Sequence, residues 1–194
     1  TVGSVRLDQM LAYSRRERGE FLSEEGLSPD KKTIMFSSTW RGCSLIQTYG
    51  NVLVRKIQKL SSEYNVVITI HENNFIEKYS PGKDWRSILC VLEKDFAVKV
   101  LWDREAPFKF LALADMLISD QTSLTYFYSF LCRPIILFYG ISNEGSLPRP
   151  FSNGLKRASF VLQNGLDNLE NDIVYAFKNF NRERMAGLSE ALFS

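Results

Sequence analysis

One histidine and a pair of neighbouring hydroxyl residues are the side chains of this sequence best placed for chemistry on a phosphate group. His71 directly follows an apolar run at residues 65–70, where an imidazole can donate to a phosphate oxygen or transfer a proton. Thr122 and Ser123 lie between a second apolar run and a helical segment, where hydroxyls and free backbone N–H groups favour a phosphate or diphosphate. An ordinary surface histidine and ordinary helix caps fit the same positions, so the local sequence leaves both interpretations open.

Other polar residues also follow the expected strands. Arg41 and Ser44 lie in the turn after residues 33–38, and Ser119 and Asp120 lie in the turn that leads to the hydroxyl pair. The first turn resembles a phosphate loop only loosely, because it lacks both the G-x-G-x-x-G fingerprint and the G-x-x-x-x-G-K-[ST] pattern. We expect Asp120 to orient hydroxyl groups of its own loop.

Two further residues are expected to be structural. Trp40 is expected to pack against the sheet rather than stack on a base. Asp115 is expected to begin a strand with a hydrogen bond. Asp115 and Asp120 would lie at opposite ends of that strand, roughly 15 Å apart, which argues against hydrolysis by paired carboxylates.

Short apolar segments alternate with helical periods after residue 32. Strands are expected at residues 33–38, 65–70, 96–101, 115–118, 134–139 and 158–162. Helices are expected at residues 45–60, 84–93, 107–114, 123–132, 166–180 and 182–192, and a loop at residues 140–154. This alternation predicts an α/β fold, a Rossmann-like parallel sheet with helices on both faces.

The parallel sheet also indicates where a ligand would bind. Ligands of such sheets bind outside the carboxyl ends of the strands, so the polar residues after each strand should meet at one edge. We therefore expect one pocket to be lined by Arg41, His71, Thr122 and Ser123.

The first 32 residues differ in character from the rest. Residues 1–32 are polar and helical in tendency, and they are expected to be a lead-in or linker from an N-terminal domain missing from this sequence. Residues 33–194 are expected to form the Rossmann-like domain. The chain begins with Thr1 rather than methionine, which indicates a piece of a longer chain.

The composition excludes several classes of protein. The net charge of +2 over 194 residues argues against binding nucleic acid through global charge. No apolar run reaches the roughly 18–20 residues of a membrane span, although a weak attraction of the Arg-rich start to an anionic membrane surface stays open. A single histidine and three cysteines without a C-x-x-C pair argue against a metal site, and Cys90 and Cys132 are expected to pack inside helices.

Several motifs together resemble one family, in the family's own order, over about residues 3–140. They are GSVRLD at residues 3–8, KTIMFSSTWR at residues 32–41, His71, ADMLISDQTS at residues 114–123 and CRPII at residues 132–136. The pattern resembles the second domain of the CDP-glycerol glycerophosphotransferases, which build teichoic-acid and related capsule polymers in bacteria.

The resemblance implies the second, nucleotide-binding domain of a GT-B fold. It implies transfer of a polyol phosphate from a CDP-linked donor to a cell-surface polymer, without metal ion or cofactor, in the cytoplasm at the inner face of the plasma membrane. His71 would be catalytic and contact the diphosphate, and Thr122 and Ser123 would hold its oxygens. The remaining candidate contacts are Arg41, Ser44, Ser119 and Asp120. Because a GT-B site lies between two domains, we expect little transfer activity from this chain alone.

Three residues depart from the family pattern, and they keep two alternatives open. Glu72 replaces a proline, Gln121 replaces a tyrosine, and Phe127 stands where an acidic residue often holds the ribose. One alternative is a GT-B nucleotide-sugar glycosyltransferase or epimerase domain that prefers another nucleotide. The other is a non-catalytic nucleotide-binding or scaffold domain.

Overall fold

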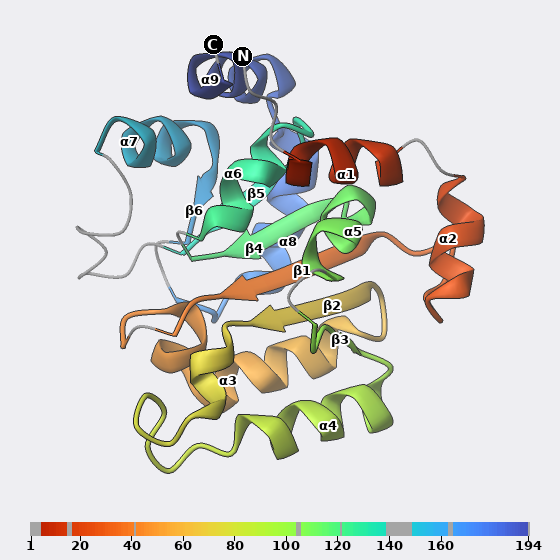
Figure 1. Cartoon of the computed structure of the whole chain (residues 1–194), viewed down its shortest axis with the longest axis vertical. Helices are drawn as coiled ribbons and strands as arrows, with labels where there is room; N and C mark the ends of the chain where they lie inside the picture. Colours follow the sequence, from red (N-terminus) through yellow and green to blue (C-terminus); the bar gives the residue numbers. More distant parts are fainter. Residues whose placement is uncertain are drawn as a thin grey trace.

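The computed structural model describes residues 5–14, 17–40, 42–103, 106–120, 122–138, 149–162 and 165–193. Its centre is a six-stranded parallel sheet with the order β3-β2-β1-β4-β5-β6 (Figure 1). The strands are β1 (Thr33–Ser38), β2 (Asn65–Ile70), β3 (Lys99–Val100), β4 (Met116–Ser119), β5 (Ile135–Leu137) and β6 (Phe160–Val161). Because β1 pairs with β2 on one side and with β4 on the other, the strand order reverses at β1. Ligands bind at the carboxyl side of such a switch point.

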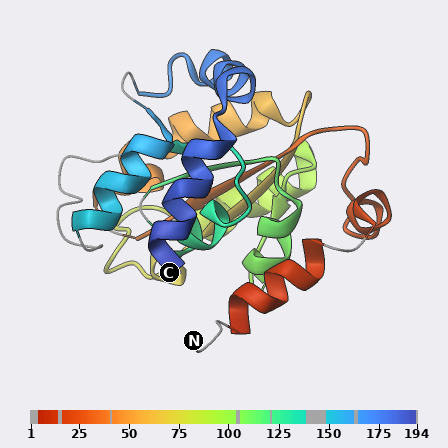
Figure 2. The same cartoon turned by 90° about the horizontal axis from the view of Figure 1, so that it is seen from above.

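Helices cover both faces of the sheet (Figure 2). They are α1 (Val5–Ser14), α2 (Arg18–Glu24), α3 (Leu45–Leu60), α4 (Trp85–Phe96), α5 (Ala106–Leu113), α6 (Ser123–Ser129), α7 (Arg149–Ala158), α8 (Leu169–Asn179) and α9 (Arg182–Phe193), with a 3₁₀ turn η1 (Glu72–Phe75). None of these helices is long and apolar enough to cross a membrane. The predicted Rossmann-like α/β fold is confirmed.

The two faces of the sheet belong to two apolar cores. Successive side chains of a strand point to opposite faces, so Ile34 and Phe36 enter one core and Met35 enters the other. The first core is completed by side chains from α3, α4 and α8, and the second by side chains from α1, α2, α5 and α6. All six residues of β1 and all six of β2 are buried, which explains why both strands have apolar centres without a polar face.

The described part of residues 5–32 packs onto the second core. Met10 of α1 and Phe21 and Leu22 of α2 are fully buried there. The division of the chain at residue 32, and the interpretation of residues 1–32 as a linker, stay predictions.

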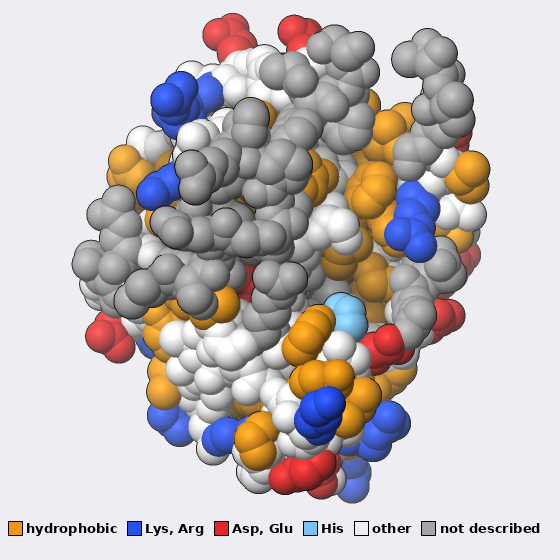
Figure 3. Space-filling view, turned by 60° about the vertical axis from the view of Figure 1, so that its left-hand side comes forward, with side chains coloured by type: hydrophobic (Ala, Val, Ile, Leu, Met, Phe, Trp, Pro, Cys, Tyr) orange, Lys and Arg blue, Asp and Glu red, His pale blue; other side chains and the backbone are white. Residues whose placement is uncertain are grey.

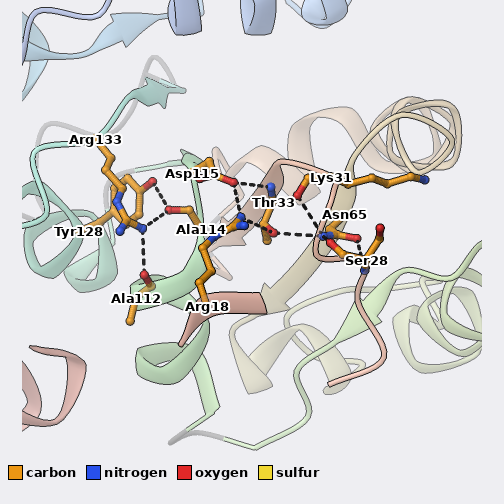
Figure 4. Close-up of polar contacts among 10 residues, drawn as sticks. All are labelled: Arg18, Ser28, Lys31, Thr33, Asn65, Ala112, Ala114, Asp115, Tyr128 and Arg133. Atoms are coloured by element: carbon orange, nitrogen blue, oxygen red, sulfur yellow. Dashed lines mark hydrogen bonds and ion pairs between the residues drawn. The ribbon is translucent and has the colours of Figure 1, made fainter. Parts of the chain in front are cut away.

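Polar contacts at the amino edge of the sheet attach α2 to the strands (Figure 4). Asp115 Oδ2 accepts hydrogen bonds from Thr33 N at 2.7 Å and from Arg18 Nη2 at 2.6 Å. Asn65 Nδ2 donates to the carbonyl oxygen of Ser28 at 2.7 Å, next to the start of β2. The structural role expected for Asp115 is therefore confirmed. In the same sheet Ser37 pairs with Thr69 of β2 and with Ser119 of β4, so the carboxyl ends of the three strands are level.

Some sequence expectations are wrong in detail. The loop expected at residues 140–154 is helical from Arg149, where α7 begins; residues 139–148 lie outside the described part of the chain. The strand expected at residues 96–101 is reduced to Lys99–Val100, because α4 continues to Phe96 and Ala97 caps it with φ of 52°. Cys90 of α4 is exposed, so the packing expected for it is wrong, whereas Cys132 is half-buried and packs against the second core.

An acid-sensitive ion pair holds α8 against α3. Glu170 accepts from Lys56 Nζ at 2.8 Å and pairs with Lys59 Nζ at 3.0 Å. Burial acts to raise the pKa of Glu170, but the lysine contacts outweigh it and hold the pKa at about 2, below the ordinary 4.5. A carboxyl whose pKa is lower in the folded state stabilises the fold above its unfolded pKa and loses that contribution as the pH falls.

Glu170→Gln is therefore expected to lower the free energy of unfolding by about 1 kcal/mol at pH 7, the scale of a partly exposed ion pair. The difference from wild type should shrink as the pH falls below 4.5 toward 2. Urea denaturation across that pH range measures it, with the exposed Glu63→Gln as the control. A difference that stays constant down to pH 3 would contradict the linkage.

Candidate functional site at the carboxyl edge of the sheet

The carboxyl ends of β1, β2 and β4 bring most of the predicted site residues to one edge. His71 follows β2, Ser44 lies in the loop after β1, Ser119 ends β4 and Asp120 follows it. Because β1 lies between β2 and β4, about 10 Å, or two strand spacings, separates the ends of the outer pair. Arg41 and Gln121 lie outside the described residues.

His71 is exposed at this edge, and Figure 3 shows the chain's one histidine at the surface of the face seen there. Its backbone N–H donates to the carbonyl oxygen of Ser38 at 3.0 Å, which continues the β1–β2 ladder by one residue. Its Nδ1 accepts a hydrogen bond from Asn73 N at 3.2 Å. The neutral ring must therefore carry its proton on Nε2, the nitrogen with which it can donate to a phosphate oxygen.

Trp40 packs beside His71. Its ring centroid lies 4.8 Å from that of Tyr79 and 6.2 Å from that of His71. Trp40 is half-buried between the loops that follow β1 and β2. Trp40 was expected to pack against the sheet, and its ring contacts are instead to side chains that follow β2.

Asp120 is a buried anchor beneath the edge. Its carboxyl accepts from Ser38 Oγ at 2.8 Å, Leu45 N at 2.9 Å and Thr39 N at 3.0 Å, and the side chain is 1% exposed. Burial raises the pKa of Asp120, and these hydrogen bonds act against the rise. Asp120 therefore ties the end of β4 to the loop after β1 and to the start of α3. Its carboxyl orients that loop, and its backbone carbonyl oxygen accepts from the nearby hydroxyls of Ser119 at 2.7 Å and Thr125 at 3.2 Å.

Ser44 and Ser119 are also buried beneath the edge. Ser44 is the N-cap of α3, and its Oγ accepts from Gln47 N at 3.4 Å. Ser119 Oγ donates to the carbonyl oxygen of Asp120 at 2.7 Å. Both hydroxyls are hydrogen-bonded within the protein and stabilise the loops. A ligand at the surface would contact more exposed side chains first.

Thr122 and Ser123 begin α6, a helix of seven residues. Thr122 is the half-buried N-cap, and its backbone N–H donates to Thr125 Oγ1 at 3.4 Å. Ser123, the first helical residue, is exposed. Among the described candidates, the side chains that reach the surface at this edge are therefore His71, Thr122 and Ser123.

The structure adds residues that the sequence analysis missed. Ser38 Oγ donates to Asp120 and accepts from Ile46 N at 3.0 Å, so it links β1 to α3 and β4. Asn74 is fully buried and bridges the loops after β1 and β2. A polar residue that ends a buried strand is a signal that could have identified Ser38. Asn74 stands in a polar loop, and nothing in its spacing marks it.

Two of the departures noted in the sequence have clear positions. Phe127 packs edge-to-face on Phe108 at 5.2 Å, against the second core. Glu72 is exposed and begins η1, directly beside His71. Among the described residues, no three His, Cys, Asp or Glu side chains lie close enough together to hold a metal ion.

Comparisons with solved structures relate this fold to GT-B enzymes. A variant of the wall teichoic acid polymerase TagF matches with a TM-score of 0.65 and 18% identity, over 98% of this chain and 46% of that one. The catalytic domain of starch synthase IV from Arabidopsis thaliana matches with a TM-score of 0.52 and 11% identity, over 97% of this chain and 39% of that one. The C-terminal CMP-Kdo binding domain of WaaA from Acinetobacter baumannii matches with a TM-score of 0.53 and 8% identity, over 95% of this chain and 99% of that one. At these identities the matches show the fold alone.

The family itself is shown by sequence. The chain spans less than half the length of the TagF chains that it matches. No curated protein sequence matches it significantly. The model of the CDP-glycerol:poly(glycerophosphate) glycerophosphotransferase family matches residues 1–141, about three quarters of the chain and every strand end of the candidate site. The chain therefore belongs to the CDP-glycerol:poly(glycerophosphate) glycerophosphotransferase family.

Proposed function

We propose that this chain is the nucleotide-diphosphate-binding half of a transferase that moves a polyol phosphate, such as glycerol phosphate, from a CDP-linked donor to a polymer. Its family and its GT-B neighbours make it a transferase domain. The observation that carries the finer proposal is that the family match contains His71, Thr122 and Ser123, which share one edge of the sheet. The family name supplies the donor class, and a TagF variant of 16% identity has been soaked with CDPG.

The diphosphate of the donor would lie across the ends of β2 and β4. His71 would approach it from one side with Nε2–H, and the hydroxyls of Thr122 and Ser123 would approach it from the other. Exposed donor groups on both sides suit a charge-dense anion, since hydrogen bonds to charged groups are stronger than neutral ones. Arg41 is predicted to contact the same diphosphate.

The reaction is a substitution at phosphorus. A hydroxyl oxygen of the acceptor attacks the phosphorus that carries the polyol, and the P–O bond to CMP breaks with its electron pair on CMP. The acceptor proton goes to a base, which the family resemblance places on another domain. His71 would stabilise the negative charge that grows on the leaving phosphate. Neither a metal ion nor a cofactor takes part in this proposal.

The partners and the location are part of the same proposal. They are a nucleotide-linked donor, a cell-surface polymer as acceptor and an N-terminal domain that completes the cleft, with no nucleic acid. The acceptor implies action in the cytoplasm at the inner face of the plasma membrane, with peripheral contact. Release of CMP from CDP-glycerol by the whole protein, dependent on a polymer acceptor, tests the activity.

Ser123→Ala tests the diphosphate site directly. We expect the affinity for CDP to fall by roughly 5- to 150-fold, corresponding to about 1–3 kcal/mol for a hydrogen bond to a charged group. The affinity for cytidine should not change, because cytidine places no phosphate at Ser123. Calorimetric titrations of the whole protein with CDP, cytidine and UDP measure these affinities and compare the bases.

The fold should tolerate this substitution. Thr122 is the N-cap of α6 and Ser123 is exposed, so we expect a stability change within about 0.5 kcal/mol. Ser23→Ala on α2 is the matched control, since it also replaces an exposed helical serine. Equal losses for CDP and cytidine would remove Ser123 from the phosphate site.

A further inference from the structure

The side chain of Asn74 is buried beside the turn that contains His71. It is 0% exposed. Its Nδ2 donates to the carbonyl oxygen of Thr39 at 3.1 Å and to that of His71 at 3.0 Å, and its Oδ1 accepts from Gln47 Nε2 at 2.7 Å. Three elements therefore meet at one amide: the loop after β1, the turn after β2 and helix α3.

The chemistry of the partners fixes the orientation of this amide. Carbonyl oxygens only accept, so the two N–H groups of Asn74 must face Thr39 and His71. The oxygen of Asn74 then faces the amide nitrogen of Gln47, which must donate. Gln47 Nε2 also donates to Ser80 Oγ, so the loop that follows η1 is held by the same pair of amides.

The turn that contains His71 is closed twice by Asn74. The backbone N–H of Asn74 donates to the carbonyl oxygen of His71 at 2.9 Å, and the side chain donates to the same oxygen. This closure places the intervening Asn73 N–H against His71 Nδ1. The side chain of Asn74 thus acts on the imidazole through the geometry of one short turn.

We propose that Asn74 is the positioning residue of His71: it holds the turn in which Asn73 N–H occupies Nδ1, and so keeps the ring proton on Nε2, pointed away from the turn. The exposed imidazole is thereby set in one tautomer by a buried amide. That this tautomer serves donor binding and transfer rests on the proposed function, whereas the positioning itself does not.

The tautomer is tested without any substrate. Long-range ¹H–¹⁵N spectra of the whole protein distinguish the two nitrogens of a neutral imidazole, and the signals of His71 are those that disappear in His71→Ala. We expect the Nε2–H form in wild type, a mixture of both forms in Asn74→Ala, and no change in Asn51→Ala, which replaces an exposed asparagine of α3. An unchanged Nε2–H spectrum in Asn74→Ala would overturn the proposal.

Gln47→Ala provides a milder variant in case Asn74→Ala does not fold. It leaves Asn74 in place and removes the donor to Oδ1. We expect a smaller shift toward the mixed tautomers, and a spectrum identical to wild type would overturn the proposal as well.

Kinetics then separate positioning from general structure. For CMP release from CDP-glycerol, Asn74→Ala should lower kcat by about 10- to 100-fold, the cost of misplacing a group by about 1 Å. It should cause no further loss when His71 is already alanine, because the two residues act as a unit. Full additivity of the two losses would contradict the proposal. A wild-type protein that releases no CMP would instead refute the proposed function, and the tautomer measurement would still decide the role of Asn74.

Discussion

Replacing Asp120 with alanine is expected to lower the free energy of unfolding by about 4 kcal/mol, among the largest effects of single substitutions. The change removes the acceptor of Ser38 Oγ–H, Thr39 N–H and Leu45 N–H. Each buried donor left without a partner costs about 1–3 kcal/mol. Relief from burying a carboxyl group offsets part of this cost, which is why the expected loss lies below the sum.

Urea denaturation at pH 7 measures the loss, provided that the dependence on denaturant stays the same in both proteins. The matched control is Asp95→Ala on α4, since Asp95 is an exposed carboxylate and should change the stability by no more than about 0.5 kcal/mol. If Asp120→Ala lowers the free energy of unfolding by less than about 1 kcal/mol, water replaces the carboxylate as hydrogen-bond acceptor. Asp120 is then not needed to stabilise the loops at the carboxyl edge of the sheet.

The parallel sheet was predictable because its buried strands have a simple signal. β1 and β2 were expected at residues 33–38 and 65–70, and they occupy Thr33–Ser38 and Asn65–Ile70. Strands that are covered on both faces have apolar centres without alternation, and the polar residues at and after their ends mark the carboxyl edge. The position of His71 at that edge follows from the same pattern.

Helix α7 was not predictable, because tertiary packing overrides its local sequence. Pro150 and Gly154 favour a turn, so residues 140–154 were assigned to a loop. In the structure Leu155 is fully buried in the second core, and a Cβ on Gly154 would lie only 2.7 Å from Leu188 Cδ1 of α9. The glycine that suggests a turn is the residue that lets the two helices approach.

The roles of the hydroxyl residues could not be separated by spacing. Ser44, Ser119 and Ser123 all lie in turns after the expected strands, so the sequence makes each of them an equal candidate for contact with a diphosphate. Their depths differ: Ser44 and Ser119 are buried and bonded to the protein, and Ser123 is exposed. Depth depends on the neighbouring loops, which Asp120 and Asn74 organise through contacts between residues far apart in sequence.

His71→Ala is expected to lower the rate of CMP release from CDP-glycerol by about 100- to 1,000-fold, the usual cost of removing one preorganised donor to a developing charge. The loss should fall mainly on kcat, because the hydrogen bond from Nε2–H strengthens as negative charge grows on the departing phosphate. Steady-state kinetics of the whole protein with CDP-glycerol and a polymer acceptor separate kcat from KM.

The position of His71 makes this test a clean one. The side chain is exposed, so we expect its removal to leave thermal unfolding nearly unchanged. His71→Gln keeps an amide donor without the geometry of the ring, and its rate should lie between those of wild type and His71→Ala. If KM alone rises in His71→Ala, the imidazole binds the donor equally in ground and transition states, and charge stabilisation during transfer must come from another residue.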